Sequence, residues 1–365
     1  MHWWWILLAL TLLGAAAWKL RGRDQWPGSR SASQDAERLY QEGMDCRRGV
    51  GMDVDFVRAR VLLLQAADKG HAPAQFDLGM LLRQGLGGAP DAAEGMRWIE
   101  RAAEAGELRA QLCMAKCALV GHDIEQNVQS AEFWLHSAAQ AGSAEAQAAL
   151  GALYRDKSSQ LRNPLKAAEW IKRSAEQGFP AAMFALSELY EHGEGVVRDV
   201  HAADAWLLKA AERGVPEAEF KLAKFYLNGA FGHQFPLDYR KALHWFKWAG
   251  VHGVAEAEYE QGLLYERNEG VDEPDKVRAV ECFLNAAQMG FAPAQYRMGQ
   301  LYTYGDVVTQ NLSEARRWFA VAAAQGYQDA AEQVKKLNGR VAEQPFMTSP
   351  GPAEPAPGNA PDWEG

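Results

Sequence analysis

The sequence predicts an all-α fold, a right-handed α-solenoid of about eight helix-turn-helix repeats preceded by one transmembrane helix. The solenoid is indicated by one phrase that recurs along the chain, as in AWLLKAAERGVPEAEFKLAKFYLNG and CFLNAAQMGFAPAQYRMGQLYTYG. Self-similarity at a fixed period is typical of repeat proteins, whose hairpins bury their apolar faces against one another. We expect a membrane anchor at residues 1–20, a linker at 21–34, the solenoid at 35–340 and a disordered, Pro-rich acidic tail at 341–365.

The first element is an uncharged run of sixteen residues from Trp3 to Trp18. As a helix it reaches about 24 Å, which is short of the ~30 Å hydrocarbon core of a bilayer, but snorkelling of Lys19 would help to close the gap. Basic residues follow directly, and by the positive-inside rule they favour a single-pass anchor with the solenoid on the cytoplasmic side. A signal peptide cleaved after Ala17, which would leave the solenoid periplasmic or secreted, is the alternative.

Each repeat carries one glycine that serves as its marker, and successive markers lie 36 to 39 residues apart. The segment before the glycine is rich in helix formers, and glycine suits the left-handed position that ends a helix. In four repeats a proline then lies in the first turn of the next helix, where its missing N–H costs nothing. We therefore expect a helix hairpin at each of the markers Gly70, Gly106, Gly142, Gly178, Gly214, Gly253, Gly290 and Gly326.

A tryptophan lies eight residues before the marker in six repeats, at Trp98, Trp134, Trp170, Trp206, Trp245 and Trp318. It shares a helix face with an alanine pair that must pack inward, so we interpret this stripe as core rather than as a ligand-stacking ladder. Leu62 and Cys282 occupy the same position in the first and seventh repeats. Cys282 is therefore predicted to be a small buried hydrophobe rather than a reactive thiol.

The order of these residues, with a Trp, an Ala pair and the marker Gly followed by A-x-x-x-L-G-x-x-Y, resembles the Sel-one-like repeat of the tetratricopeptide-repeat-like superfamily. The resemblance covers about residues 35–338, although the first repeat lacks the Trp and Ala118 replaces the Tyr of the third. It implies a non-catalytic scaffold or adaptor that binds other proteins and needs no cofactor. An envelope-assembly or regulatory factor outside the cytoplasm is the alternative, and a hydrolase with a site between hairpins is less favoured.

Composition and motifs point away from other function classes. A net charge of −9 argues against a nucleic-acid surface, which needs clustered Lys and Arg. There is no H-E-x-x-H, phosphate loop or nucleophile elbow, so we expect no metal, cofactor or small-molecule substrate. Cys113 and Cys117, with His122 and His136 following, could seed a zinc site, but two packing thiols are the favoured interpretation because no fourth ligand has a fixed spacing.

Candidate partner-binding residues lie on the first helices, at positions that change identity from repeat to repeat. Repeat proteins commonly line their concave surface with these helices, although an ordinary solvated face is an equal alternative. The candidates are Asp77, Met80, Glu188, Lys221, Lys224, Glu260, Arg297 and Gln300.

Two further sets of aromatic residues lie outside the tryptophan stripe. The longest repeat adds a loop at residues 228–239 that contains Phe231, His233 and Phe235, which are either a contact site or side chains that fold back onto the neighbouring hairpin. An aromatic stripe on the first helices favours packing between repeats over a peptide-binding ladder, at Phe76, Phe184, Phe220, Tyr259 and Tyr296.

Overall fold

The computed structural model describes residues 27–341 except residue 231, and this part of the chain contains seventeen helices and no strand. From the amino terminus they are α2 (Pro27–Arg48), α3 (Phe56–Asp68), α4 (Ala72–Gln84), α5 (Ala92–Glu104), α6 (Leu108–Val120), α7 (Val128–Gln140), α8 (Ala144–Arg155), α9 (Pro164–Glu176), α10 (Pro180–His192), α11 (Val200–Glu212), α12 (Pro216–Asn228), α13 (Tyr239–Val251), α14 (Ala255–Arg267), α15 (Lys276–Gln288), α16 (Ala292–Tyr304), α17 (Leu312–Ala324) and α18 (Gln328–Val341).

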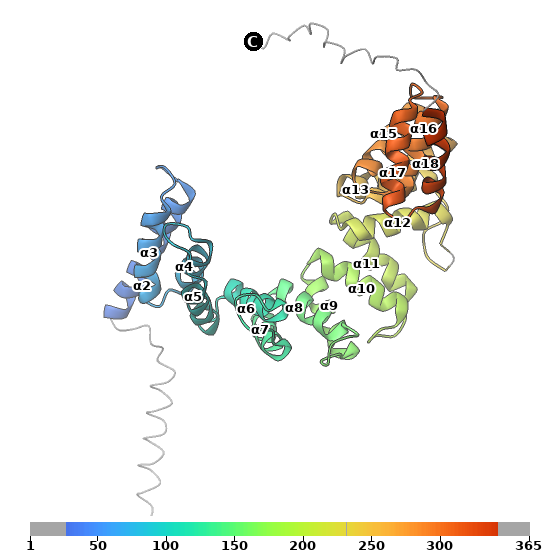
Figure 1. The fold of residues 1–365 in the computed structure, drawn as a ribbon. Coiled ribbons are helices and arrows are strands. Elements are labelled where there is room, and N and C mark those ends of the chain that lie inside the picture. The colour runs from blue at the N-terminus through green and yellow to red at the C-terminus, as the bar shows by residue number, and fades with distance from the viewer. Residues whose placement is uncertain (1–26, 231, 342–365) are drawn as a thin grey trace, which may run out of the picture. The chain divides into compact units, whose positions relative to one another are not determined.

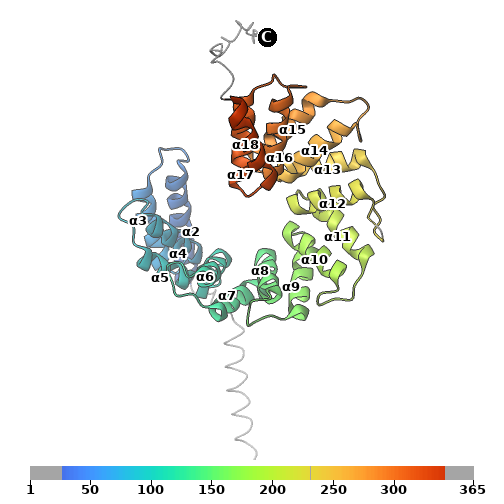
Figure 2. The ribbon, with the colours of Figure 1, turned by 45° about the vertical axis from the view of Figure 1, so that its right-hand side comes forward.

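These helices form two compact units, one that ends at Trp206 and one that begins at Leu207, so the boundary falls within α11. Consecutive helices pack against one another from α2 to α10 in the first unit and from α12 to α18 in the second (Figures 1 and 2). We call the helix after a marker glycine the first helix of its hairpin, and the helix that ends at the next marker the second helix. Helix α2 is the first helix of the first hairpin. The predicted all-α solenoid of about eight hairpins is confirmed.

The marker glycines end the second helices as predicted. All eight have positive φ, between 76° and 95°, a conformation that costs glycine no Cβ clash. At the first marker, the Gly70 amide donates to the carbonyl of Ala67 and the His71 amide donates to that of Ala66. These two hydrogen bonds, which form a Schellman motif, satisfy carbonyls that the helix end would otherwise leave unpaired. The prolines lie in the first turn of α4, α10, α12 and α16, also as predicted.

The innermost core position is the residue that follows the tryptophan slot. Its side chain is at most 2% exposed in every hairpin. Of the tryptophans, Trp98, Trp134 and Trp170 are 7–9% exposed, which agrees with their interpretation as core, whereas the other three are half-buried. The residues of the innermost position are Leu63, Ile99, Leu135, Ile171, Leu207, Phe246, Phe283 and Phe319.

Opposite this position, the first helix carries a residue that is too close for a larger side chain. A Cβ added to Gly151 would lie 2.5 Å from Cγ1 of Ile171, and one added to Gly299 would lie 2.7 Å from the ring of Phe319. Gly79 and Gly262 are equally close to the innermost residues of their hairpins. In these hairpins the glycine of the repeat therefore sets how closely the two helices approach.

An Asp or Asn begins the second helix of every hairpin, always seven residues before the tryptophan slot. In α5, for example, the carboxylate of Asp91 accepts a hydrogen bond from the Glu94 amide at 2.9 Å, and the Asp91 amide donates to the carbonyl of Leu82 at 2.8 Å. One residue thus caps the second helix and ties it to the first. The eight residues are Asp55, Asp91, Asn127, Asn163, Asp199, Asp238, Asp275 and Asn311.

The structure differs from the sequence prediction near the amino terminus. Helix α2 begins at Pro27, inside the segment 21–34 that was predicted to be a linker. Proline is favoured at the first position of a helix, and after Gly28 no helix-breaking residue interrupts the segment. The predicted anchor at 1–20 and all but the first residue of the predicted tail at 341–365 lie outside the described residues. Within the described residues, no helix combines the length and the apolar character that a membrane span needs.

The close approach of the helices makes a testable prediction. Gly151→Ala should lower the free energy of unfolding by about 1–3 kcal/mol, because the new methyl group overlaps Ile171. Urea denaturation followed by circular dichroism measures the loss. Ala152→Met, at the next and exposed position of α8, should change the free energy by less than about 0.5 kcal/mol. Equal stability of Gly151→Ala and the parent chain would show that the helices can separate at little cost.

Candidate functional site

The candidate site is the first-helix face of each unit, because residues of this face differ from repeat to repeat while the positions that pack the hairpin recur. Most of the charged candidates on this face are paired with residues of a neighbouring repeat. In the second unit, Nζ of Lys224 lies 2.8 Å from Oε1 of Glu260 and so joins α12 to α14. Arg297 forms an ion pair with Glu266, which joins α16 to α14, and also donates to Gln300 at 2.8 Å.

Glu188 of the first unit is paired in the same way. Its carboxylate accepts a hydrogen bond from Arg155 of α8 at 2.8 Å, and Arg155 also donates to Glu194 at 3.1 Å. Burial alone would lower the pKa of Arg155, but these two carboxylates raise it above its ordinary value. The guanidinium therefore keeps its charge. Lys221, in the second unit, has its ammonium 5.9 Å from the ring centroid of Phe225. The ion pairs of Arg155 join neighbouring repeats, and all of these contacts reduce what the side chains can offer to a partner.

Asp77 is buried, with only 2% of its surface exposed. Its two carboxylate oxygens accept hydrogen bonds from Arg47 at 2.7 Å, from Arg109 at 3.2 Å and from the hydroxyl of Tyr40 at 3.1 Å. The donors come from α2 and α6, on either side of α4. Burial alone would lower the pKa of Arg109, but its interactions with Glu107 and Asp77 raise this pKa above its ordinary value. Asp77 therefore holds two guanidinium groups in place and does not itself face a partner.

The inserted loop at 228–239 folds back onto its own hairpin. Phe235 is 5% exposed, stacks on Phe225 with ring centroids 5.8 Å apart and meets Tyr226 edge-on at 5.4 Å. The ring of His233 lies 4.5 Å from that of Phe225. Of the two alternatives that the sequence left open, Phe235 and His233 therefore adopt the one in which the side chains fold back onto the hairpin. Phe231 lies outside the described residues.

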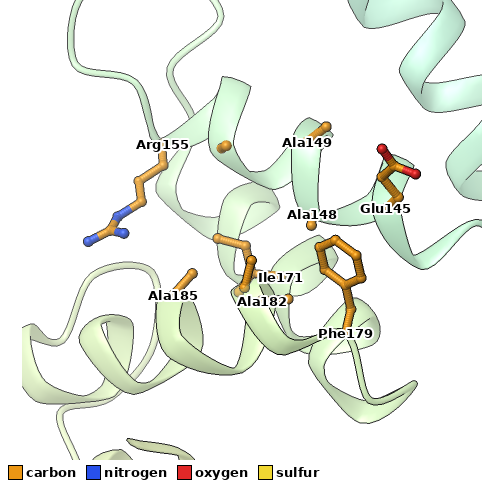
Figure 3. A pocket seen from close by; sticks show the side chains of 10 residues that line it. Glu145, Ala148, Ala149, Arg155, Ile171, Phe179, Ala182 and Ala185 are labelled. Atoms are coloured by element: carbon orange, nitrogen blue, oxygen red, sulfur yellow. The ribbon is translucent and has the colours of Figure 1, made fainter. Parts of the chain in front are cut away.

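Two hollows lie on the first-helix face of the first unit. One, which we call the alanine-lined hollow, has a volume of about 340 Å³ and lies between α8 and α10. Small side chains leave this space open, and Figure 3 shows Arg155 at one end and Glu145 at the other. Its lining consists of Glu145, Ala148, Ala149, Ala152, Arg155, Ile171, Phe179, Ala181, Ala182 and Ala185.

The other, which we call the arginine-lined hollow, has a volume of about 560 Å³ and is formed by residues of α2, α4 and α6 together with Phe56 of α3 and Leu86. It brings together the candidates Asp77 and Met80 with three arginines that sequence reasoning had not selected. Its lining consists of Met44, Arg47, Arg48, Phe56, Phe76, Asp77, Met80, Leu86 and Arg109. A third hollow, in the second unit, has a volume of about 230 Å³ and includes the candidate Arg297.

Features of the sequence indicate both hollows of the first unit. Ala149, Ala152 and Ala185 occupy the variable positions of α8 and α10, and a run of alanines where other repeats carry long side chains indicates open space. The arginines give a weaker signal. Arg47 and Arg48 lie in the last turn of the first helix of the first repeat, which lacks the tryptophan, and Arg109 precedes the repeat alanine of its hairpin.

Cys282 is buried as predicted, and the thiols of Cys282 and Cys113 have raised pKa values. Cys282 is 7% exposed, and burial raises the pKa of its thiol to about 12. Burial also raises the pKa of Cys113 to about 11, with a further contribution from Cys117. Among the described residues, no group of three or more His, Cys, Asp or Glu could hold a metal ion. His136 instead meets Trp170 edge-on at 5.7 Å.

The aromatic stripe packs within and between repeats. Tyr259 contacts Phe283 and Phe291, with ring centroids 5.5 and 5.4 Å apart. Tyr296 contacts Phe319 and Tyr327 at 5.3 and 5.0 Å. Phe76 is covered by the guanidinium of Arg109 at 4.7 Å, so the first ring of the stripe also belongs to the arginine-lined hollow.

Comparison with known proteins agrees with this architecture. The model of the Sel1 repeat matches eight segments, at residues 38–71, 72–107, 108–143, 144–179, 180–215, 216–249, 255–291 and 292–327. A Sel1 repeat protein from Oxalobacter formigenes is 29% identical, with a TM-score of 0.67 over 87% of this chain and 91% of that one. A protective antigen present in uropathogenic Escherichia coli strains, which displays an SLR fold, is 25% identical, with a TM-score of 0.58 over 83% of this chain and 72% of that one.

The pairing of Asp77 leads to a second prediction. Asp77→Asn should lower the free energy of unfolding by about 1–3 kcal/mol, because a buried carboxylate that binds two guanidinium groups is replaced by a neutral amide. Glu188→Gln is the matched control. Its ion pair is partly exposed on both sides, so the same chemical change should cost less than about 1 kcal/mol. Equal losses in the two variants, measured by urea denaturation, would contradict a special role for Asp77.

Proposed function

We propose, since the chain belongs to the Sel1 repeat family, that it is a non-catalytic scaffold that binds another protein along its first-helix face. The observation that carries the proposal is the pair of hollows on that face of the first unit. In a stack of hairpins the constant residues are used to pack one repeat on the next. Space that the neighbouring repeats leave unfilled is therefore available to an outside side chain.

The alanine-lined hollow suits an apolar side chain of a helical or extended peptide. Its volume of about 340 Å³ is at the lower end of the range for ligand pockets, and its walls are mainly methyl groups of alanine with Ile171 and Phe179. A peptide that places one anchor residue in such a hollow gains hydrophobic burial, and the surrounding helices set its direction.

We further propose that residues 3–18 anchor the scaffold in a membrane, with the repeats on the cytoplasmic side. The support is the uncharged run, the tryptophans at both of its ends and the basic residues that follow it. The anchor would confine a bound partner to the bilayer surface. A periplasmic or secreted scaffold with the same face is the second candidate, because alanines precede a site where a signal peptidase could cleave.

Photo-crosslinking in cells tests the scaffold function. Benzoylphenylalanine placed at Ala152 on α8 or at Lys116 on α6, both exposed on first helices, should give crosslinks to a discrete partner band. The control position is Lys172, which is exposed on the second helix α9. Crosslinks of equal yield from Lys172, or none from either first-helix position in a chain that is folded by circular dichroism, would contradict binding at this face.

The membrane proposal has its own test. A reporter that is active only in the cytoplasm, fused after residue 340, should be active, and the fusion should sediment with membranes. Deletion of residues 3–18 should release the protein into the soluble fraction, because the apolar run supplies the bilayer affinity. Activity from a reporter that works only outside the cytoplasm would overturn the orientation and favour the second candidate.

A further inference from the structure

The arginine-lined hollow is built by three successive repeats of the first unit. Arg47 and Arg48 come from the last turn of α2, the buried Asp77 from α4 and Arg109 from α6. Three guanidinium groups and one carboxylate thus line one hollow in a chain whose net charge is −9. This local excess of positive charge runs against the balance of the whole protein, and it attracts a negatively charged group.

Asp77 orients two of these guanidinium groups but leaves most of their donors available. Arg47 uses one N–H on Asp77, and Arg109 uses one on Asp77 and one on Glu107. Each guanidinium has five N–H donors in a planar fork. Because the two arginines are held by a carboxylate that is itself buried, they lose little additional conformational freedom when they bind an anion.

Arg48 is the third cation, and its side chain is exposed on the rim. It forms no hydrogen bond, ion pair or ring contact with any other residue in the described part of the chain. An arginine without an internal partner next to two arginines that are held in place is an available site for a carboxylate, which the guanidinium fork binds through two parallel hydrogen bonds.

The walls of the same hollow are apolar. Phe56 and Phe76 contribute aromatic rings, and Met44, Met80 and Leu86 contribute flexible or branched aliphatic groups. Methionine adapts its shape to different ligands and makes favourable contacts with aromatic rings. A volume of about 560 Å³ holds more than a single ion, so the hollow fits an anionic group that is attached to an apolar one.

We propose that the arginine-lined hollow binds an acidic peptide segment in which a Glu or Asp adjoins a large apolar residue. The carboxylate pairs with Arg48 and the free donors of Arg47, and the apolar side chain packs against Phe56, Phe76 and Met80. This proposal rests on the proposed scaffold function and names the chemistry of its partner at one of the two hollows.

Fluorescence anisotropy with the full chain tests the proposal. The probe is a fluorescein-labelled peptide Gly-Ser-Glu-Phe-Glu-Leu-Glu-Gly-Ser. Replacing its three Glu by Gln, or its Phe and Leu by Ser, should weaken binding by about tenfold or more, because each change removes one of the two groups that the hollow recognises. Arg48→Glu should weaken binding of the parent probe by about tenfold or more for the same reason.

Arg58→Glu is the matched control, since Arg58 is exposed on α3 near the hollow, has no side-chain partner among the described residues and does not line the hollow. It should change the affinity by less than about twofold, because Arg58 does not line the hollow and the field of an exposed charge is weakened by salt. Equal losses of affinity for Arg48→Glu and Arg58→Glu would overturn the assigned site. The site would also be overturned if inorganic phosphate displaced the probe as effectively as the unlabelled peptide does. If Arg48→Glu does not fold, Arg48→Gln replaces it, with Arg58→Gln as its control.

The photo-crosslinking at Ala152 separates this proposal from the scaffold function. Crosslinks to a cellular partner without any binding of the acidic probe would overturn the proposed peptide chemistry and leave the scaffold standing. Specific probe binding without crosslinks from any first-helix position would support the hollow and contradict the scaffold.

Discussion

The close contact between the two helices of each hairpin is the constraint on which the rest of the structure depends. Gly151 and Gly299 leave no space for a Cβ atom against Ile171 and Phe319. The large residue that follows the tryptophan slot on the second helix is almost wholly buried in every hairpin. Hairpins that share this buried contact can stack repeatedly, and the sequence outside the contact is free to vary.

The two ends of the second helix are determined just as strictly. An Asp or Asn caps its start and bonds back to the first helix, and a glycine with positive φ ends it. These local interactions involve backbone groups that would be unpaired at any helix terminus, so they work in every repeat whatever the neighbouring residues are. This independence explains how one repeat can accept an inserted loop at 228–239 without losing its helices.

Much of this architecture could be predicted from the sequence because its causes are local and repeat at a fixed period. The marker glycines, the proline positions and the burial of Cys282 follow from periodicity and helix-terminus chemistry. The tertiary contacts of individual side chains could not be predicted from the repeat pattern. By pattern, Phe235 lies in an inserted loop and Asp77 on the variable face, yet both are buried because residues from other segments surround them. A single sequence does not contain the distances that decide such cases.

The internal pairing of charges also changes what variability on the first-helix face means. Lys224 and Glu260 lie at variable positions of their helices, but each is the counter-charge of the other across adjacent repeats. Such pairs must change together to avoid leaving a partly buried charge alone, so their variation is explained without any outside partner. Residues that vary and have no internal counter-charge are more informative, and Arg48 is one of them. Specificity in a scaffold of this kind is therefore expected where the packing between repeats is incomplete, in hollows and at unpaired charges, rather than along the whole variable face.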